Sequence, residues 1–140
     1  MSIHAYKTAL RRLEAPRELE RRILAANSAG LDAHRAAYDA TEDPQARLEI
    51  LAYGLGTAAN ENQAFWRALR RDVSDERNAL HPALRAGLIS LSLWVDARTT
   101  DLLRGRGTVA PLVEVNRIVS AGLGRSEASC EAGSKDIPCP

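Results

Sequence analysis

Residues 82–103 read PALRAGLISLSLWVDARTTDLL, and this stretch decides the fold. Proline at its first position marks a helix start, because its missing N–H would have no helical partner there. Apolar side chains then recur at helical spacing on two opposite faces: Leu84, Leu88, Leu91, Val95 and Leu102 on one, and Ala86, Ile89, Leu93 and Ala97 on the other, with Trp94 between them. A helix that is apolar on two sides lies at the centre of a bundle, or another element covers one of its sides.

Proline also marks the other predicted helix starts. Three prolines precede stretches with helical apolar spacing, namely Pro16, Pro44 and Pro111. We expect residues 3–15 to form a short helix of their own, and the helices from the first two prolines to end at about Asp39 and Val73. Asp43 is a suitable N-cap for the second of these, since its carboxylate can accept hydrogen bonds from free backbone N–H groups.

The last predicted helix ends at Gly122 and Gly124, because no apolar periodicity follows. Residues 125–140 are therefore predicted to be a disordered tail. Over residues 1–124 the sequence predicts one all-α domain, a small antiparallel bundle of four to five helices. The composition agrees, since aromatic residues make up only 4% and a sheet draws on aromatic and β-branched residues.

Charge, hydropathy and cysteine placement exclude several classes of protein. Nineteen basic and 18 acidic side chains leave a net charge of +1, so no bulk field attracts nucleic acid or a membrane. No apolar stretch approaches the roughly 18–20 residues of a membrane span, and the N-terminus has no apolar signal region. Cys130 and Cys139 lie near the C-terminus and cannot staple the core. We therefore expect a reduced, cytoplasmic protein without membrane insertion.

No catalytic or metal-binding constellation is present in the sequence. The three histidines are isolated, no Cys/His metal spacing occurs, and the glycines match neither the phosphate-binding loop nor the dinucleotide fingerprint. We therefore expect no enzyme activity, no metal and no cofactor. His34 lies near an apolar stripe and is interpreted as a structural or interfacial residue.

Polar and aromatic residues on the apolar stripes allow two interpretations. Asn62 precedes Trp66 by one turn, and Asn116 lies beside the stripe of the last helix. A buried amide without partners costs about 1–3 kcal/mol, so each asparagine either bonds to another helix or contacts a partner. The internal bond is the favoured interpretation. For Trp66 and Trp94, core packing and interface anchoring both remain open.

Several short segments form an ordered pattern across the chain. They are Ala5-Tyr6 with Ala15-Pro16-Arg17-Glu18-Leu19-Glu20, Asn62 to Trp66 and on to Leu69 and Asp72, Leu84-Arg85-Ala86, Ile89 to Val95, Pro111 to Ile118, and Gly122-Leu123. In order and spacing they resemble the flagellar biosynthesis regulator family FlaF over about residues 3–123. Residues 27–46 match no part of that pattern, and residues 74–80 match it only loosely.

The resemblance implies a non-enzymatic, cytoplasmic protein of alphaproteobacteria that promotes flagellin synthesis and secretion. It implies action opposite to, or together with, the flagellin-translation repressor FlbT, and a chaperone-like role toward flagellin. Candidate partner-binding residues are Tyr6, Leu10, Arg17, Trp66, Ile89, Leu93, Trp94, Asn116 and Arg117.

A flagellin-binding mechanism follows from the two-sided helix at residues 82–103. The terminal helices of flagellin are amphipathic, and a bundle can accept such a helix into an apolar groove. Ile89 and Leu93 need a cover if the opposite face is in the core. Residues 3–15 are the candidate cover, either displaced by flagellin or packed there permanently.

Two alternatives place the protein elsewhere in flagellin regulation. Arginines at 11–22 and 67–77 suggest an RNA-level regulator that acts on flagellin messenger RNA directly or through FlbT. Interleaved acids and the absence of an RNA-binding signature argue against direct nucleic-acid contact. A scaffold that binds the repressor without touching flagellin is the third possibility.

Overall fold

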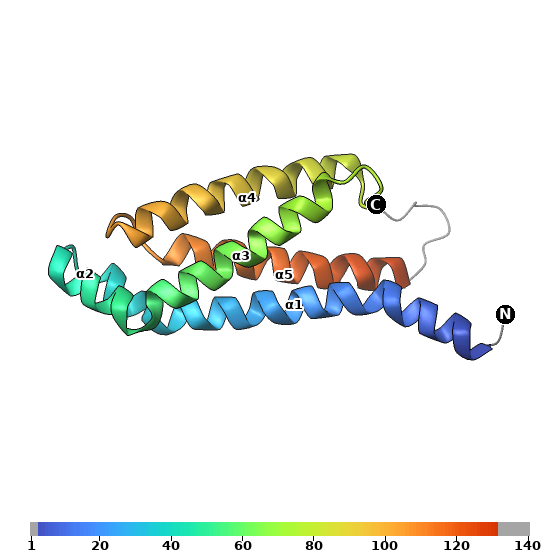
Figure 1. The fold of residues 1–140 in the computed structure, drawn as a ribbon, viewed down its shortest axis with the longest axis horizontal. Coiled ribbons are helices and arrows are strands. Elements are labelled where there is room, and N and C mark those ends of the chain that lie inside the picture. Colours follow the sequence, from blue (N-terminus) through green and yellow to red (C-terminus); the bar gives the residue numbers. More distant parts are fainter. Residues whose placement is uncertain (1–2, 132–140) are drawn as a thin grey trace.

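The computed structural model describes the backbone of residues 3–131 and the side chains of residues 18–122. It is built from helices alone over the described residues, which confirms the all-α prediction. The elements are α1 (Ile3–Asp39), α2 (Pro44–Ile50), the π-helical turn η1 (Leu51–Leu55), α3 (Gly56–Ser74), α4 (Pro82–Leu103) and α5 (Ala110–Glu131) (Figure 1).

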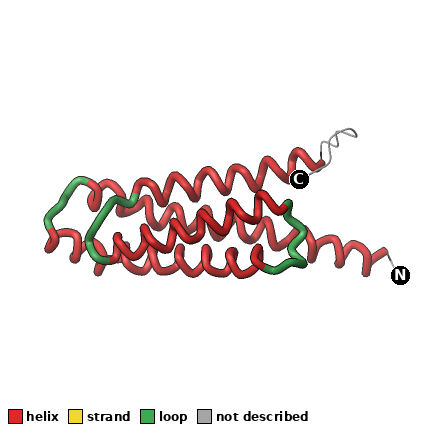
Figure 2. The backbone as a smooth tube through the Cα atoms, turned by 90° about the horizontal axis from the view of Figure 1, so that it is seen from above, coloured by secondary structure: helices red, strands yellow, loops and turns green. Residues whose placement is uncertain are grey.

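The four long helices form an antiparallel bundle (Figures 1 and 2). α1 packs along α5 and also against α3, while α3 packs along α4. α3 crosses the bundle diagonally, so its first turns lie beside α1 and its later turns beside α4 (Figure 1). The core lies between these helices, and its largest wholly buried side chains are Trp66, Tyr38, Leu24, Leu31, Leu55, Leu102 and Leu112.

Two of the predicted helix starts are confirmed in detail. Asp43 caps α2, where its carboxylate accepts a 3.0 Å hydrogen bond from the backbone N–H of Ala46. His81 caps α4 through Nδ1, which accepts a 3.1 Å hydrogen bond from the backbone N–H of Ala83. In both helices a proline directly follows the cap, where its missing N–H costs nothing.

The predicted helix start at Pro16 is wrong. α1 is a single helix that runs through this proline from Ile3 to Asp39. A proline inside a helix costs about 3 kcal/mol, and the packing of the rest of α1 against α5 and α3 offsets this cost. The first turns of α1 leave the line of the rest of the helix (Figure 1).

The single helix predicted from Pro44 to Val73 is broken at Gly54. This glycine has a φ of 140°, a conformation that side chains with a Cβ rarely adopt. His34 of α1 lies against it, so that a Cβ at Gly54 would come within 3.0 Å of the His34 Nε2. His34 therefore has the structural role that its isolation in the sequence suggested. The break gives the turn η1, from which α3 runs back along the bundle.

We predict that Gly54→Ala lowers the free energy of unfolding by about 1–3 kcal/mol, because alanine is strained at this φ and would press on His34. Urea denaturation at 25 °C measures the change. Gly87→Ala is the control, since Gly87 lies within α4 with open space around it, and there alanine should stabilise by up to about 1 kcal/mol. Equal effects of the two substitutions on the free energy of unfolding would contradict the requirement for glycine at position 54.

The predicted end of the last helix at Gly122 and Gly124 is also wrong. α5 begins at Ala110, one residue from the prediction, and runs through both glycines to Glu131. A helical glycine costs only about 1 kcal/mol, so it does not end a helix by itself. Of the predicted tail, residues 132–140 lie outside the described residues.

One end of the bundle is closed by side chains that bond to distant backbone. The Tyr38 hydroxyl donates to the Leu102 carbonyl at 2.8 Å. Buried Arg47 donates to the carbonyls of Thr41 and Gly105 at 2.7 and 2.9 Å, and its guanidinium lies 4.2 Å from the centre of the Tyr38 ring. The guanidinium of Arg47 thereby joins the connection between α1 and α2 to the connection between α4 and α5.

The same end contains a helix cap supplied from a distance. The Asp39 carboxylate, at the end of α1, accepts hydrogen bonds from the backbone N–H groups of Val109 and Ala110 at 2.7 and 3.1 Å. These groups open α5, where negative charge is favourable for the helix dipole. The last residue of the first helix thus caps the last helix.

Stability should fall at alkaline pH through Tyr38. Burial raises the pKa of its hydroxyl above the ordinary 10.0, although the charge of Arg47 opposes this. The folded state therefore holds this proton more tightly, and the resulting stability is present below pH 10.0 and lost as pH rises through the folded-state pKa. We expect urea unfolding to show this decline in the native chain and less of it in Tyr38→Phe. Exposed Tyr53 provides the control, because Tyr53→Phe should show the same dependence of stability on pH as the native chain. If Tyr38→Phe also shows the native dependence, the alkaline decline does not come from Tyr38.

Candidate partner-binding surface

One apolar side of α4 is left uncovered by the bundle. Leu93 is 56% exposed, and Ile89, one turn earlier on the same side, is half-buried. Trp94, which lies between the two faces, is also half-buried. The core-facing side carries Leu88, Ser92, Val95, Thr99 and Leu102. The predicted core face is confirmed for Leu88, Val95 and Leu102. Leu91 is half-buried against the core, and Leu84, at the start of the same face, is 39% exposed. The second apolar face exists as the sequence indicated.

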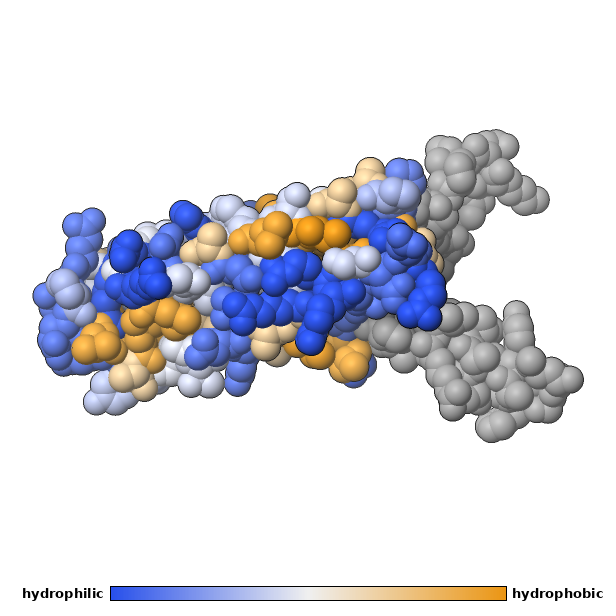
Figure 3. All heavy atoms as spheres, turned by 45° about the horizontal axis from the view of Figure 1, so that its top comes forward, coloured by the Kyte–Doolittle hydropathy of each residue, from blue (hydrophilic) through white to orange (hydrophobic). Residues whose placement is uncertain are grey.

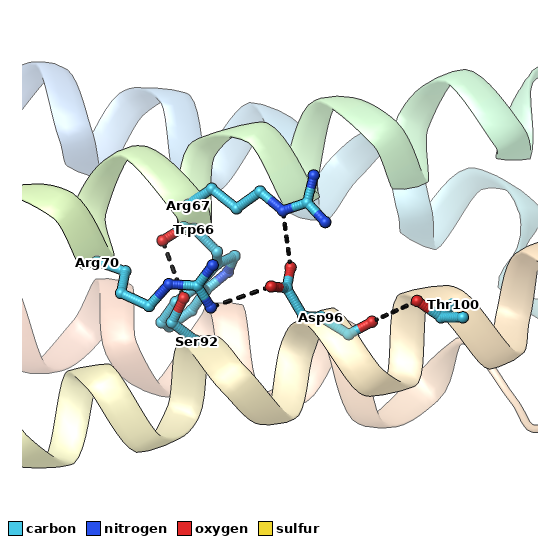
Figure 4. Close-up of polar contacts among 6 residues, drawn as sticks. All are labelled: Trp66, Arg67, Arg70, Ser92, Asp96 and Thr100. Atoms are coloured by element: carbon cyan, nitrogen blue, oxygen red, sulfur yellow. Dashed lines mark hydrogen bonds and ion pairs between the residues drawn. The ribbon is translucent and has the colours of Figure 1, made fainter.

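This outer surface of α4 is bordered by charged residues. The Asp96 carboxylate accepts hydrogen bonds from Arg67 and Arg70 of α3 at 3.2 and 3.0 Å (Figure 4). Beneath them, the Ser92 hydroxyl donates to the Trp66 carbonyl at 3.0 Å. On the face drawn in Figure 3, hydrophobic side chains form a strip along the molecule beside a strip of charged ones. The contacts hold α3 and α4 at a fixed spacing next to the exposed apolar side chains.

The predicted cover for Ile89 and Leu93 is not formed. The first turns of α1 extend past the end of the bundle instead of lying over α4 (Figures 1 and 2). The rest of α1 packs against α5 and α3. The hypothesis that residues 3–15 shield this surface is therefore wrong. Tyr6, Leu10 and Arg17 all belong to α1, but their side chains lie outside the described ones.

Trp66 and Asn116 lie in the core and not on a surface. Both are wholly buried, and the Trp66 indole N–H donates to Asn116 Oδ1 at 2.8 Å. The Asn116 amide in turn donates to Asn62 Oδ1 at 2.7 Å. The favoured interpretation of an internal hydrogen bond between helices is confirmed. A partner has no access to these two side chains while the bundle is closed.

Replacing Asn116 tests how far the bundle depends on this network. Asn116→Ala leaves the Trp66 indole N–H and the Asn62 oxygen without partners, and we expect a loss of about 2–4 kcal/mol in the free energy of unfolding. Urea denaturation followed by tryptophan fluorescence measures it. Asn60→Ala, on the exposed side of α3, should change stability by less than about 0.5 kcal/mol. A small effect of Asn116→Ala would show that the network contributes little.

Arg117 lies on a second feature, a groove between α1 and α5. It is exposed and pairs with Glu114, and this hydrogen bond holds the pKa of the Glu114 carboxyl below its usual range. The groove has a volume of about 890 Å³ and is lined by Arg21, Ala25, Ser28, Ala29, Asp32, Arg35, Val113, Glu114, Arg117, Ser120 and Ala121. Sequence reasoning missed the groove, because small residues on two separate helices leave no local pattern.

Two further exposed apolar residues were also missed. Leu48 is 59% exposed on α2, and Tyr53 of η1 is 85% exposed. Both follow from the break at Gly54, which turns this segment away from the line of α3.

Two kinds of feature are absent from the described residues. No group of three or more His, Cys, Asp or Glu side chains that could hold a metal ion occurs among them. No helix in the same part of the chain has the length and apolarity needed to cross a bilayer.

Comparison with known proteins gives the family. Neither the curated proteins nor the solved structures provide a match. The sequence profile described as "Flagellar protein FlaF" matches residues 2–123, which include every described helix from α1 to α4 and the part of α5 that carries Asn116. The match covers most of the chain and agrees with the resemblance in the sequence. The chain therefore belongs to the flagellar protein FlaF family.

Proposed function

We propose that this protein serves flagellum biogenesis by binding the terminal helices of flagellin in the cytoplasm and promoting flagellin synthesis and secretion. Membership of the FlaF family supports the flagellar role. The observation that carries the binding mechanism is the exposed apolar side of α4, formed by Ile89 and Leu93.

The exposed side of α4 has the chemistry that an amphipathic helix requires. Such a helix buries its apolar stripe against an apolar strip and keeps its polar side in water. Leu93 has the most exposed apolar side chain of α4. Ile89 and Trp94, on either side of it, are half-buried and pack against the core. The Arg67, Arg70 and Asp96 cluster on the border can bond to polar groups of the bound helix and so orient it.

Shielding of flagellin explains why such a surface stays open in the folded protein. Each apolar side chain that a client buries contributes about 1.5–3 kcal/mol at most, so a few of them give reversible binding. Reversible binding is what a carrier needs, because the client must be released for export. We also propose partner contacts for Tyr6, Leu10 and Arg17 of α1, and for Arg117 at the groove. The FlbT repressor is proposed as a second partner.

Direct action on messenger RNA is less well supported by the described side chains. Arg67 and Arg70 bridge Asp96, and Arg21 and Arg22 pair with Glu18. Phosphate contact would require these cations to leave their carboxylates. An RNA-level effect through the repressor remains compatible with the flagellar role.

Leu93→Asp tests the proposed surface. The substitution places a charge where an apolar contact is proposed, so affinity for flagellin should fall about tenfold or more. Isothermal calorimetry measures binding to full-length flagellin and to flagellin without its terminal helices, and only the full-length form should bind. Leu48→Asp is the matched control, because Leu48 is equally exposed but lies on α2 (59% against 56%).

The outcomes separate the candidate mechanisms. Leu93→Asp that keeps its thermal unfolding midpoint and binds flagellin normally would refute the α4 surface. Absence of binding to either flagellin form would refute the flagellin mechanism and direct attention to the repressor. Binding of flagellin leader RNA that weakens steeply with salt would instead support the RNA mechanism.

A further inference from the structure

Three asparagines lie in the core of the bundle, on three different helices. Asn27 belongs to α1, Asn62 to α3 and Asn116 to α5, and all three are buried, with Asn27 the most exposed at 8%. Asn116 uses both its amide nitrogen and its oxygen. The amide nitrogens of Asn27 and Asn62, in contrast, are buried without a hydrogen-bond partner among the described residues.

The helix register brings these two residues to the same level of the bundle. α1 and α3 approach very closely at Gly30 and Ala58, where a Cβ built on the glycine would lie 3.6 Å from the alanine Cβ. The two helices are antiparallel, so one turn back along α1 and one turn forward along α3 lead to the same height in the bundle. Those positions are Asn27 and Asn62.

Two buried amide donors at one level require an acceptor. Burial without hydrogen bonds is costly for an amide, and native proteins keep such groups paired through protein or ordered water. Both groups are N–H₂ donors, so they cannot satisfy each other. A single water molecule can accept one hydrogen bond from each of them, and buried waters occur where two to four polar groups converge.

We propose that Asn27 and Asn62 hold one buried water molecule between α1 and α3. The water completes the polar network that runs from Ser92 and Trp66 through Asn116 to Asn62, and extends it to α1. All four long helices are then joined by one hydrogen-bonded chain. This inference is independent of flagellin binding.

Stability measurements test the proposal from one side, because a rise in the thermal unfolding midpoint of Asn27→Leu would overturn it. If the water is present, Asn27→Leu breaks the bridge and leaves the Asn62 nitrogen unpaired, so the thermal unfolding midpoint falls by about 3 °C or more. If the two nitrogens are simply unpaired, Asn27→Leu removes a buried polar group and the midpoint rises. Asn60→Leu on the exposed side of α3 is the control for the higher helix propensity of leucine.

A crystal structure of the full chain decides the matter directly, because a fall in the midpoint could also come from crowding by the larger leucine. The proposal requires an electron-density peak within about 3.2 Å of both amide nitrogens. Absence of a peak would overturn it. Crystals soaked in bromide identify the acceptor: no anomalous signal at the peak supports water, and an anomalous signal would assign the site to a halide and overturn the proposal.

Discussion

The hydrogen bonds from the Trp66 indole to Asn116, and from Asn116 to Asn62, are the contact on which the rest of the bundle depends. α3 and α5 are not neighbours in sequence, and these bonds fix both their distance and their register. The carbonyl of the same tryptophan accepts from Ser92, so α4 is aligned by the same turn of α3. A purely apolar core would tolerate sliding of one helix along another, whereas a buried amide has one position in which it is satisfied.

The fixed position of α4 explains how an apolar strip can remain exposed without loss of the fold. One side of α4 uses Leu88, Val95 and Leu102 for the core. The border with α3 is held by Asp96 and two arginines. Neither set of contacts needs Leu93, so this side chain is available to a partner. The proposed binding surface and the stabilising contacts thus use different sides of one helix.

Much of this architecture could be predicted from sequence because it is local. The helix class, the Asp43 cap, the two apolar sides of residues 82–103 and the internal hydrogen bonding of Asn62 and Asn116 all follow from spacing and residue type. The errors at Pro16, Gly54 and Gly122 have one cause: tertiary packing decides whether a helix continues through an unfavourable residue. Arg47 and Asp39 were not identified, because their partners lie in loops and helix starts far along the chain. The α1–α5 groove was missed for the same reason.

The capping of α5 by Asp39 means that one stabilising contact of α1 can form only late in synthesis. The carboxylate and the N–H groups that it receives are separated by 70 residues of chain. α1 leaves the ribosome early, but its C-terminal carboxylate has no α5 to cap until the last helix emerges. The energetic reward for closing this long loop therefore comes only at the end. The contacts of α3 with α1 and with α4 do not involve α5 and can form earlier, so the Asp39 cap completes a bundle in which the other helices already have neighbours.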